Sequence, residues 1–565
     1  MIWRCWWRCC CFALGLLVCL ANASCRALRD SPFRTLSIPS APIYNENLSI
    51  CETSAPTCCT HDLEQEMLTT TRNDVSNAIQ DRIIVLKHIF DQNYHTFEKH
   101  NRGAISSSRE QLHAMFTRTY GPFYQSHTQI FISFFDNLQQ FYTNQTYASL
   151  KTILEEFFFA LFRTMFAILN PLEKVTKKDF ECLRRSMSSL EPFADIPTKM
   201  SIQLERSVGT ARSLTQALRS TSQILQSVLQ REISSPCTEA ATRMTHCALC
   251  TEKHPIKPCA NLCLNVFKGC LAEYAQLDEP WNLLVGSLSK LAHRLKGPYN
   301  VISVVIPIAV QISESIMLFQ EKGPMISAKV IQKCLRKEKK DVIMKREVGP
   351  TYATAATINP LRFSEPNASV NMHMMTSFIE RLKTTKGFWR GLPTSICISG
   401  EWAASSEEHC WNGTHSREYE RSLVGDGIRN QVFNPEFSSA QNLSSEDFLN
   451  DILKISMLSN QLSDIYDGRH LRNETIEGEG SGMGITYTPV DDEDGDDSSG
   501  MDSDLPIVVD IAGSHRDLQE ILTTVPTMQR PKILLEVLDN GYQRTTPNRC
   551  FIILLLFMFL SLRLF

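Results

Sequence analysis

The chain has 565 residues, of which 43% are hydrophobic and 21% are charged, and its formal net charge is -4. This composition is ordinary for a globular protein with a sizeable core. The absence of a basic excess argues against nucleic acid as a partner, and the small acidic excess argues against a highly solvated chain.

The first 23 residues have the order of a secretory signal peptide. Arg4 and Arg8 precede an apolar run from Cys11 to Leu20, and Ala21–Ala23 supplies small residues at the cleavage point. A membrane-spanning anchor is the alternative, but the run is shorter than the roughly 20 apolar residues that cross a bilayer. The mature chain is therefore expected to begin near Ser24.

Apolar residues of the following region recur every three or four positions, which lines one face of an α-helix. Strand alternation is scarce and no longer repeat emerges, so residues 24–472 are predicted to form an all-α domain with these stripes in its core. The stripes are Val75, Ile79, Ile83, Leu86, Phe90, Tyr94 and Phe97; Phe131, Phe134, Leu138 and Phe141; Leu154, Phe158, Leu161, Met165 and Leu169; Leu204, Val208, Ala211, Leu214 and Leu218; and Phe448, Ile452, Ile455 and Leu462.

The chain has 20 cysteines, and 14 remain after removal of five in the signal peptide and Cys550 near the C-terminus. An even number fits the disulfide framework of an exported protein. One group has spacing that could instead hold a tetrahedral zinc ion, and the oxidising environment favours disulfides over zinc there. This group is Cys247, Cys250, Cys259 and Cys263, with His246 and His254 nearby.

Six Asn-X-Ser/Thr sequons support passage through the secretory route and predict exposed glycosylation sites. They are Asn47, Asn144, Asn367, Asn412, Asn442 and Asn473; a further sequon at Asn22 lies in the signal peptide.

A basic segment, Arg336–Arg346, follows Cys334 and is expected to be a solvated loop, with a protease-sensitive or anion-binding loop as the alternative.

Residues 473–539 form a different region, rich at first in Gly, Ser and Asp and poor in large apolar side chains that could offset the entropy of ordering it. We expect a disordered stalk followed by a membrane-proximal segment. Two Ser-Gly pairs lie beside acidic residues in this stalk, at Ser481 and Ser499.

The C-terminus ends in the apolar run Phe551–Phe565, which is short for a stable membrane span. A polar spacer and small residues precede it, as in a glycosylphosphatidylinositol (GPI) signal. Asp539 is predicted as the attachment residue because Gly541 then fills the small second position after it, and Asn540 is the alternative. Residues 540–565 would then be removed.

Motifs of an enzyme are not found. The sequence has no phosphate-binding G-x-x-x-x-G-K-[ST] loop, no H-E-x-x-H metal helix and no G-x-S-x-G nucleophile turn. A binding protein without catalytic or metal-ligating residues is therefore predicted.

Several cysteine motifs together resemble the glypicans, a family of cell-surface heparan sulfate proteoglycans. These motifs are the TCC of Thr57–Cys59, the run from Cys247 to Cys270, and LPTSIC followed by HCWNG around Cys397 and Cys410. The resemblance covers nearly the whole chain. LPTSIC, CWNG and GIRNQ from Gly427 look more like the branch that contains vertebrate glypicans three and five.

The resemblance implies an elongated, all-α, disulfide-stapled core followed by a disordered glycanated stalk. Heparan sulfate is expected at Ser481 and Ser499, whereas Ser399-Gly400 between Cys397 and Cys410 is expected to be a turn. The implied disulfides are Cys25–Cys58, Cys51–Cys247, Cys59–Cys250, Cys182–Cys334, Cys237–Cys270, Cys259–Cys410 and Cys263–Cys397.

A non-enzymatic coreceptor is the function that the resemblance implies. Its partners would be heparin-binding secreted growth factors and morphogens of the Wnt, Hedgehog, BMP and FGF classes, together with their receptors. The GPI lipid would hold it on the outer leaflet of the plasma membrane, with a shed extracellular form as an addition. No cofactor is expected beyond covalent heparan sulfate, N-glycans and the lipid. The alternative is an anchored adhesion or ligand-binding protein that acts through its helical core without glycosaminoglycan.

Some glypicans are cut by a furin-like protease between the cysteines that match Cys334 and Cys397. The basic segment here lacks a well-matched R-x-x-R site, so processing is left open.

Overall fold

The computed structural model describes residues 25–35, 37–44, 47–143, 145, 148–252, 254–297, 299–335, 368–437 and 446–469. The chain divides into two units, Met1–Tyr487 and Thr488–Phe565, and all described residues lie in the first. These residues form helices with only isolated β-bridges, such as Pro258 with Trp411. The expected all-α fold class is confirmed.

The helices formed by the described residues have the following bounds. They are α2 (Arg26–Arg29), α3 (His61–Tyr120), α4 (Pro122–Gln125), α5 (Thr128–Tyr142), α6 (Leu150–Leu169), α7 (Phe180–Leu190), α8 (Ile196–Leu204), α9 (Thr210–Leu229), α10 (Ser235–Thr245), α11 (Ala248–Thr251), α12 (Ala260–Cys270), α13 (Asp278–Lys296), α14 (Val301–Val305), α15 (Ile308–Val330), α16 (Ala368–Thr384), α17 (Phe388–Cys397), α18 (Ile428–Gln431) and α19 (Glu446–Tyr466), with 3₁₀-helices η1 (Pro32–Thr35), η2 (Lys177–Asp179) and η4 (Tyr274–Leu277) and π-helices η3 (Glu205–Gly209) and η5 (Ile331–Leu335).

Helix α3 is the longest element and organises the others. Its 60 residues span about 90 Å at the helical rise of about 1.5 Å per residue. The Thr60 hydroxyl caps the helix by accepting from the backbone N–H of Leu63. The helix ends at Gly121, whose φ of +49° favours glycine, immediately before Pro122.

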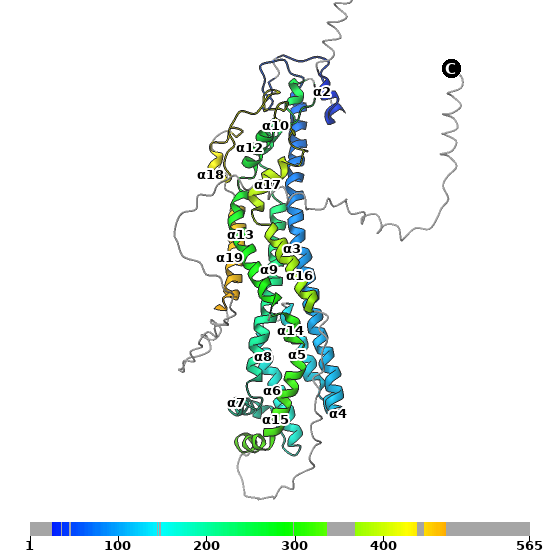
Figure 1. Ribbon diagram of the computed structural model, residues 1–565, viewed down its shortest axis with the longest axis vertical. Coiled ribbons are helices and arrows are strands. Elements are labelled where there is room, and N and C mark those ends of the chain that lie inside the picture. Colours follow the sequence, from blue (N-terminus) through cyan, green and yellow to red (C-terminus); the bar gives the residue numbers. More distant parts are fainter. Residues whose placement is uncertain are drawn as a thin grey trace, which may run out of the picture. The chain divides into compact units, whose positions relative to one another are not determined.

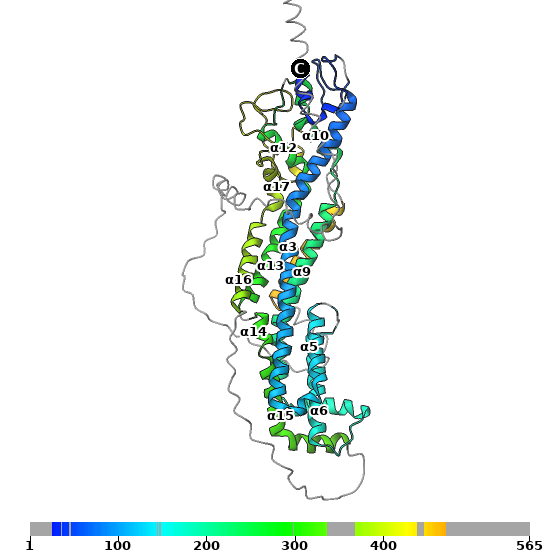
Figure 2. The same ribbon diagram turned by 90° about the vertical axis from the view of Figure 1, so that its right-hand side faces the viewer.

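Several helices pack along α3. Helices α5, α9, α10, α14 and α15 contact α3, and α13 contacts α9, α16 and α19 (Figures 1 and 2). Aromatic side chains fill the contacts: Phe90 meets Trp281 edge to face, and Phe97 meets Phe378 in the same way. The structure thus has one continuous core along α3.

The predicted stripes lie in that core with a few exceptions. All predicted residues of the α5 stripe are buried, and so are those of the stripe that begins at Leu204. Tyr94, Met165 and Ile452 are only partly buried. The prediction is wrong for Leu169, which ends α6 and is 41% exposed; only its Cδ1 atom lies close to the buried Gly323 of α15.

One stretch of the described residues, Val301–Leu335, is long and apolar enough to cross a membrane by composition. Half of its most apolar window is buried against other helices. The stretch comprises α14, α15 and η5, whose buried apolar side chains belong to the core, and it lies far in sequence from the predicted signal peptide and GPI signal.

Candidate functional site at the cysteine-rich end

Seven disulfides connect the described cysteines, and they are the pairs that the family resemblance implies. Six of them gather around α2, α10, α12 and α17, near the N-terminal end of α3 (Figure 1). The seventh joins α7 to η5. They are Cys25–Cys58, Cys51–Cys247, Cys59–Cys250, Cys182–Cys334, Cys237–Cys270, Cys259–Cys410 and Cys263–Cys397.

The zinc alternative is wrong for the Cys247 group. Each of the four cysteines is bonded to a different partner, so none offers a thiolate to a metal. Glu407 lies near the sulfurs of Cys259 and Cys410, but those two sulfurs also form a disulfide. His254 is exposed.

His246 packs into the protein as a neutral ring. Its imidazole meets the ring of Phe33 edge to face, with 5.1 Å between centroids. Burial lowers the pKa of His246 to about 4, because the charged form loses hydration there. The residue therefore joins the N-terminal segment to the end of α10 and is uncharged at neutral pH.

Glu64 in the first turn of α3 is fully buried and holds the loop that leads to Cys51. Its Oε1 accepts from the backbone N–H groups of Ile50 and Cys51, both at 2.8 Å. Its Oε2 accepts from the backbone N–H of Ser49 at 3.0 Å and from the hydroxyl of Ser49 at 2.9 Å. Burial opposes ionisation, but these hydrogen bonds outweigh it and hold the pKa of Glu64 below its usual value.

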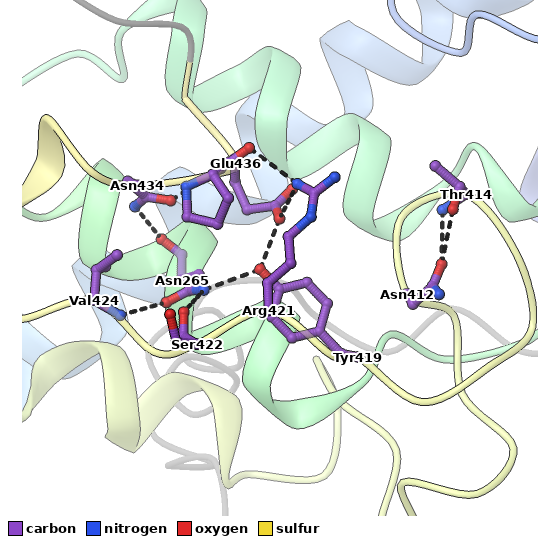
Figure 3. Close-up of polar contacts among 10 residues, drawn as sticks. Asn265, Asn412, Thr414, Tyr419, Arg421, Ser422, Val424, Asn434 and Glu436 are labelled. Carbon is purple, nitrogen blue, oxygen red and sulfur yellow. Dashed lines mark hydrogen bonds and ion pairs between the residues drawn. The ribbon is translucent and has the colours of Figure 1, made fainter.

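Asn265 on α12 fixes the irregular segment that follows Cys410 (Figure 3). Its Nδ2 donates to the hydroxyl of Tyr419 at 2.9 Å and to the carbonyl of Ser422 at 3.0 Å, while its Oδ1 accepts from the N–H of Val424 at 3.0 Å. The backbone carbonyl of Asn265 accepts from Asn434 Nδ2 at 2.8 Å. The fully buried side chain of Asn265 thus forms hydrogen bonds with Tyr419, Ser422 and Val424 of this segment.

The same network contains a buried carboxylate. Tyr419 donates its hydroxyl to Glu436 Oε1 at 2.7 Å, and Arg421 donates to the same oxygen at 3.1 Å. Burial raises the pKa of Tyr419 well above its usual range, and the nearby Glu436 carboxylate adds to this effect. Tyr419 therefore stays a hydrogen-bond donor, and the contacts drawn in Figure 3 tie the segment to Asn265 of α12.

The sequon at Asn412 lies on this rigid segment, two residues after Cys410. The Asn412 Oδ1 accepts from the N–H and hydroxyl of Thr414, both at 3.0 Å, and from the N–H of His415 at 2.9 Å. This is an Asx-turn (Figure 3). The Nδ2 atom donates only over 3.4 Å, to the carbonyl of Glu418, and Asn412 is partly exposed. The atom that a glycan would modify is therefore not needed to hold the turn.

Asn47 is exposed on the loop that Glu64 holds. Ser399-Gly400 forms a turn after α17, as expected: the Ser399 hydroxyl donates to the carbonyl of Ile396 at 2.7 Å, and Gly400 has a φ of +75°. The remaining predicted sites lie outside the described residues; they are Asn144, Asn367, Asn442, Asn473, Ser481, Ser499, Asp539, Asn540 and the basic segment Arg336–Arg346.

Sequence reasoning missed Glu64, Asn265, Tyr419 and Glu436. Each is a single polar residue whose role depends on partners that the fold delivers from elsewhere in the sequence, and no local motif marks it. Together they make the cysteine-rich end a rigid platform. Because the described cysteines are all in disulfides, this platform presents surfaces and the sequons of Asn47 and Asn412 instead of a reactive thiolate.

Comparisons with known proteins agree on one family. The family model described as "Glypican" matches residues 20–524. Glypican-1 of Gallus gallus is 27% identical over 493 residues, which cover 84% of this chain and 88% of that protein. Glypican-2 of Mus musculus is 29% identical over 414 residues, 71% of each chain.

Solved structures give the same result. The crystal structure of C-terminally truncated glypican-1 superimposes with a TM-score of 0.68 at 26% identity, covering 79% of this chain and 99% of that one. The structure of Dally-like protein in complex with O-palmitoleoyl serine superimposes with a TM-score of 0.58 at 29% identity, covering 77% of this chain and 96% of that one.

Proposed function

This chain belongs to the glypican family, and from that premise we propose that it is a non-enzymatic, cell-surface heparan sulfate proteoglycan that acts as a coreceptor for secreted ligands. One observation supports the proposal most directly. The match to the family extends beyond the helical body, which is described to residue 469, and includes both acidic Ser-Gly pairs, at Ser481 and Ser499. These serines are the proposed attachment sites for heparan sulfate.

Electrostatics gives the proposed chains their role. Heparan sulfate repeats sulfate and carboxylate groups, so it attracts basic patches on growth factors and morphogens in a way that salt weakens. A lipid anchor would confine the protein to the outer leaflet and raise the local ligand concentration near receptors. The Wnt, Hedgehog, BMP and FGF classes are the proposed ligands. Dally-like protein was solved with O-palmitoleoyl serine, which makes a lipid-modified ligand a further candidate.

The branch within the family is a separate proposal. The LPTSIC, CWNG and GIRNQ elements favoured the branch with glypicans three and five, whereas the relatives reported above are glypican-1 and glypican-2. They lend that finer assignment no support.

Glycopeptide mass spectrometry with and without heparitinase tests the proteoglycan. We expect xylose-linked chains on Ser499 and Ser481, and Ser499→Ala with Ser481→Ala should remove the heparitinase-sensitive mass. Ser399→Ala is the matched control, because that Ser-Gly pair forms a folded turn whose hydroxyl is already bonded. A discrete core without heparitinase-sensitive mass would instead favour the adhesion or ligand-binding alternative.

The anchor and localisation have their own experiment. Phosphatidylinositol-specific phospholipase C should release the protein from cells, and mass spectrometry of the released C-terminus should place the lipid on Asp539 or Asn540. Retention on cells beside a responsive control protein would favour a spanning helix.

A further inference from the structure

A cavity of about 410 Å³ lies between α8 with η3 on one side and the start of α14 and α15 on the other. Figure 1 shows these helices side by side, distant from the cysteine-rich end. The volume falls within the range of small-molecule sites, about 300–1,000 Å³. The cavity is lined by Ile202, Gln203, Arg206, Tyr299, Ser303, Val304, Pro307 and Gln311.

The lining offers hydrogen-bonding groups that the described part of the protein leaves largely unused. Gln311 Nε2 donates to Gln203 Oε1 at 3.0 Å. Among the described residues, no hydrogen bond engages the side-chain N–H groups of Gln203 or the side-chain oxygen Oε1 of Gln311, whereas the Gln311 backbone carbonyl accepts from Ser315. The exposed Ser303 adds a hydroxyl, and the exposed Arg206 contacts the Tyr299 hydroxyl only over 3.5 Å.

Arg206 is the cation of this cavity, and the neighbouring charges are already matched. Lys199 pairs with Asp195 at 2.8 Å and is attracted by Glu314. Glu205 interacts with Arg212: burial lowers the pKa of Arg212, and the Glu205 carboxylate partly opposes this effect. Within the described ranges Arg206 has no ion pair.

A second arginine shares the aromatic ring of the cavity but is committed elsewhere. The guanidinium carbons of Arg206 and Arg294 lie 5.9 and 5.6 Å from the centre of the Tyr299 ring. Arg294 donates to the backbone carbonyl of Tyr466 at 2.6 Å. Tyr299 therefore lies in a positive environment in which Arg206 retains most of its donors.

We propose that this cavity binds an acidic sugar unit, a pyranose that carries a carboxylate or a sulfate. The guanidinium of Arg206 matches the geometry of either anion. The Tyr299 ring and the Ile202 side chain offer apolar surface for the C–H face of a pyranose, and the glutamine amides and Ser303 can pair with its hydroxyls. A glycosaminoglycan is a polymer of such units. The binding site itself does not depend on the proposed function. Only the suggestion that the protein's own heparan sulfate chain occupies the cavity rests on it.

The full chain, purified from cells that cannot make glycosaminoglycans, tests the site directly. A defined heparan sulfate tetrasaccharide is titrated by calorimetry, with a neutral glucose tetrasaccharide beside it. Removing the charge with Arg206→Gln should weaken binding of the acidic probe by about tenfold or more, since a hydrogen bond to a charged group is lost. Arg429→Gln, an exposed arginine on α18 with no ion pair among the described residues, is the matched control and should bind as wild type.

Three results would overturn the proposal: equal binding of the neutral and acidic probes, equal binding by Arg206→Gln and wild type, or no binding of the acidic probe. Melting temperatures equal to wild type establish that the exposed substitution leaves the fold intact. A Tyr299→Phe variant keeps the ring and loses only the hydroxyl, so it should bind far better than Arg206→Gln.

The same titration on protein from ordinary cells distinguishes the source of the sugar. If the protein's own chain occupies the cavity, the glycanated protein should bind less probe, and heparitinase should restore binding. Equal binding by both preparations assigns the cavity to an external chain. If the protein carries no heparan sulfate, the proposed function fails while the loss in Arg206→Gln remains.

Discussion

Replacing Glu64 with glutamine should loosen the loop that carries Cys51. The carboxylate accepts four hydrogen bonds from three consecutive residues, two on each oxygen. Glutamine keeps one acceptor oxygen and turns an NH₂ group toward the other pair of donors. Either the buried N–H groups of Ile50 and Cys51 or the N–H and hydroxyl of the exposed Ser49 then lose their acceptor. Hydrogen bonds to charged groups contribute about 1.5–3 kcal/mol each, and unsatisfied buried donors add to the loss. We expect a local cost of about 3 kcal/mol or more.

Hydrogen exchange measures that cost where it arises. The backbone amides of Ser49, Ile50 and Cys51 should exchange roughly a hundredfold faster in Glu64→Gln, since opening becomes easier by about that free energy. Glu66→Gln is the matched control, because Glu66 is exposed on the next part of the same helix. Unchanged exchange at the three amides in Glu64→Gln would refute this account of the buried carboxylate.

The pH dependence follows from the lowered pKa of Glu64. A carboxyl whose pKa is lower in the folded state stabilises the fold fully above its unfolded pKa. That stabilisation is lost as the pH falls through the folded value. The difference in melting temperature between wild type and Glu64→Gln should therefore be largest near neutral pH and shrink in acid. A difference that grows in acid would contradict the direction of the shift.

Three other predictions concern packing, titration and connectivity. Gly269→Ala should lower the melting temperature, because a Cβ there would lie 2.0 Å from a ring carbon of Phe437. In the control Gly286→Ala the new Cβ meets nothing within 4 Å, so this variant should be neutral or stabilise its helix by up to about 1 kcal/mol. Equal melting temperatures of the two variants would contradict this prediction. An NMR titration should show His246 neutral down to a pKa of about 4, so its contribution to stability is complete above the ordinary value and declines as the pH falls towards 4; a midpoint near 6.5 would count against its burial. Cleavage at a protease site introduced into 336–367 should give two fragments only after reduction, because two disulfides span that segment; separation without reductant would exclude those pairs.

The helical body was predictable because its signal is local. The stripe from Val75 to Phe97 repeats with the period of an α-helix, and the neighbours that bury it need not be known in advance. Leu169 shows the limit of this reasoning, since the apolar period continues to the last residue of α6, where the side chain is nevertheless exposed. Periodicity therefore identifies the face of a helix and leaves its ends uncertain.

The polar sites could not be predicted because their partners are distant in sequence. Glu64 resembles any acidic residue that favours the first turn of a helix, and it becomes a clamp only because the chain returns through Cys51, which is bonded to Cys247. Asn265 likewise depends on a segment more than 150 residues later. The disulfide pairs themselves came from the family, since cysteine spacing alone also allowed zinc.

A Ser-Gly pair that helps to fold the chain differs from one proposed to carry a glycan. In the turn after α17 the Ser399 hydroxyl is bonded to the carbonyl of Ile396, and Gly400 provides both a left-handed φ and a carbonyl that accepts from Lys257 at 2.6 Å. Both residues are thus used to fold the chain: although Ser399 is exposed, its hydroxyl already donates to the turn. We therefore expect attachment at the Ser-Gly pairs outside the helical body, at Ser481 and Ser499, and not at Ser399. Acidic neighbours and the lack of large apolar side chains, as around Ser499, are therefore better guides to glycosaminoglycan attachment than the dipeptide itself.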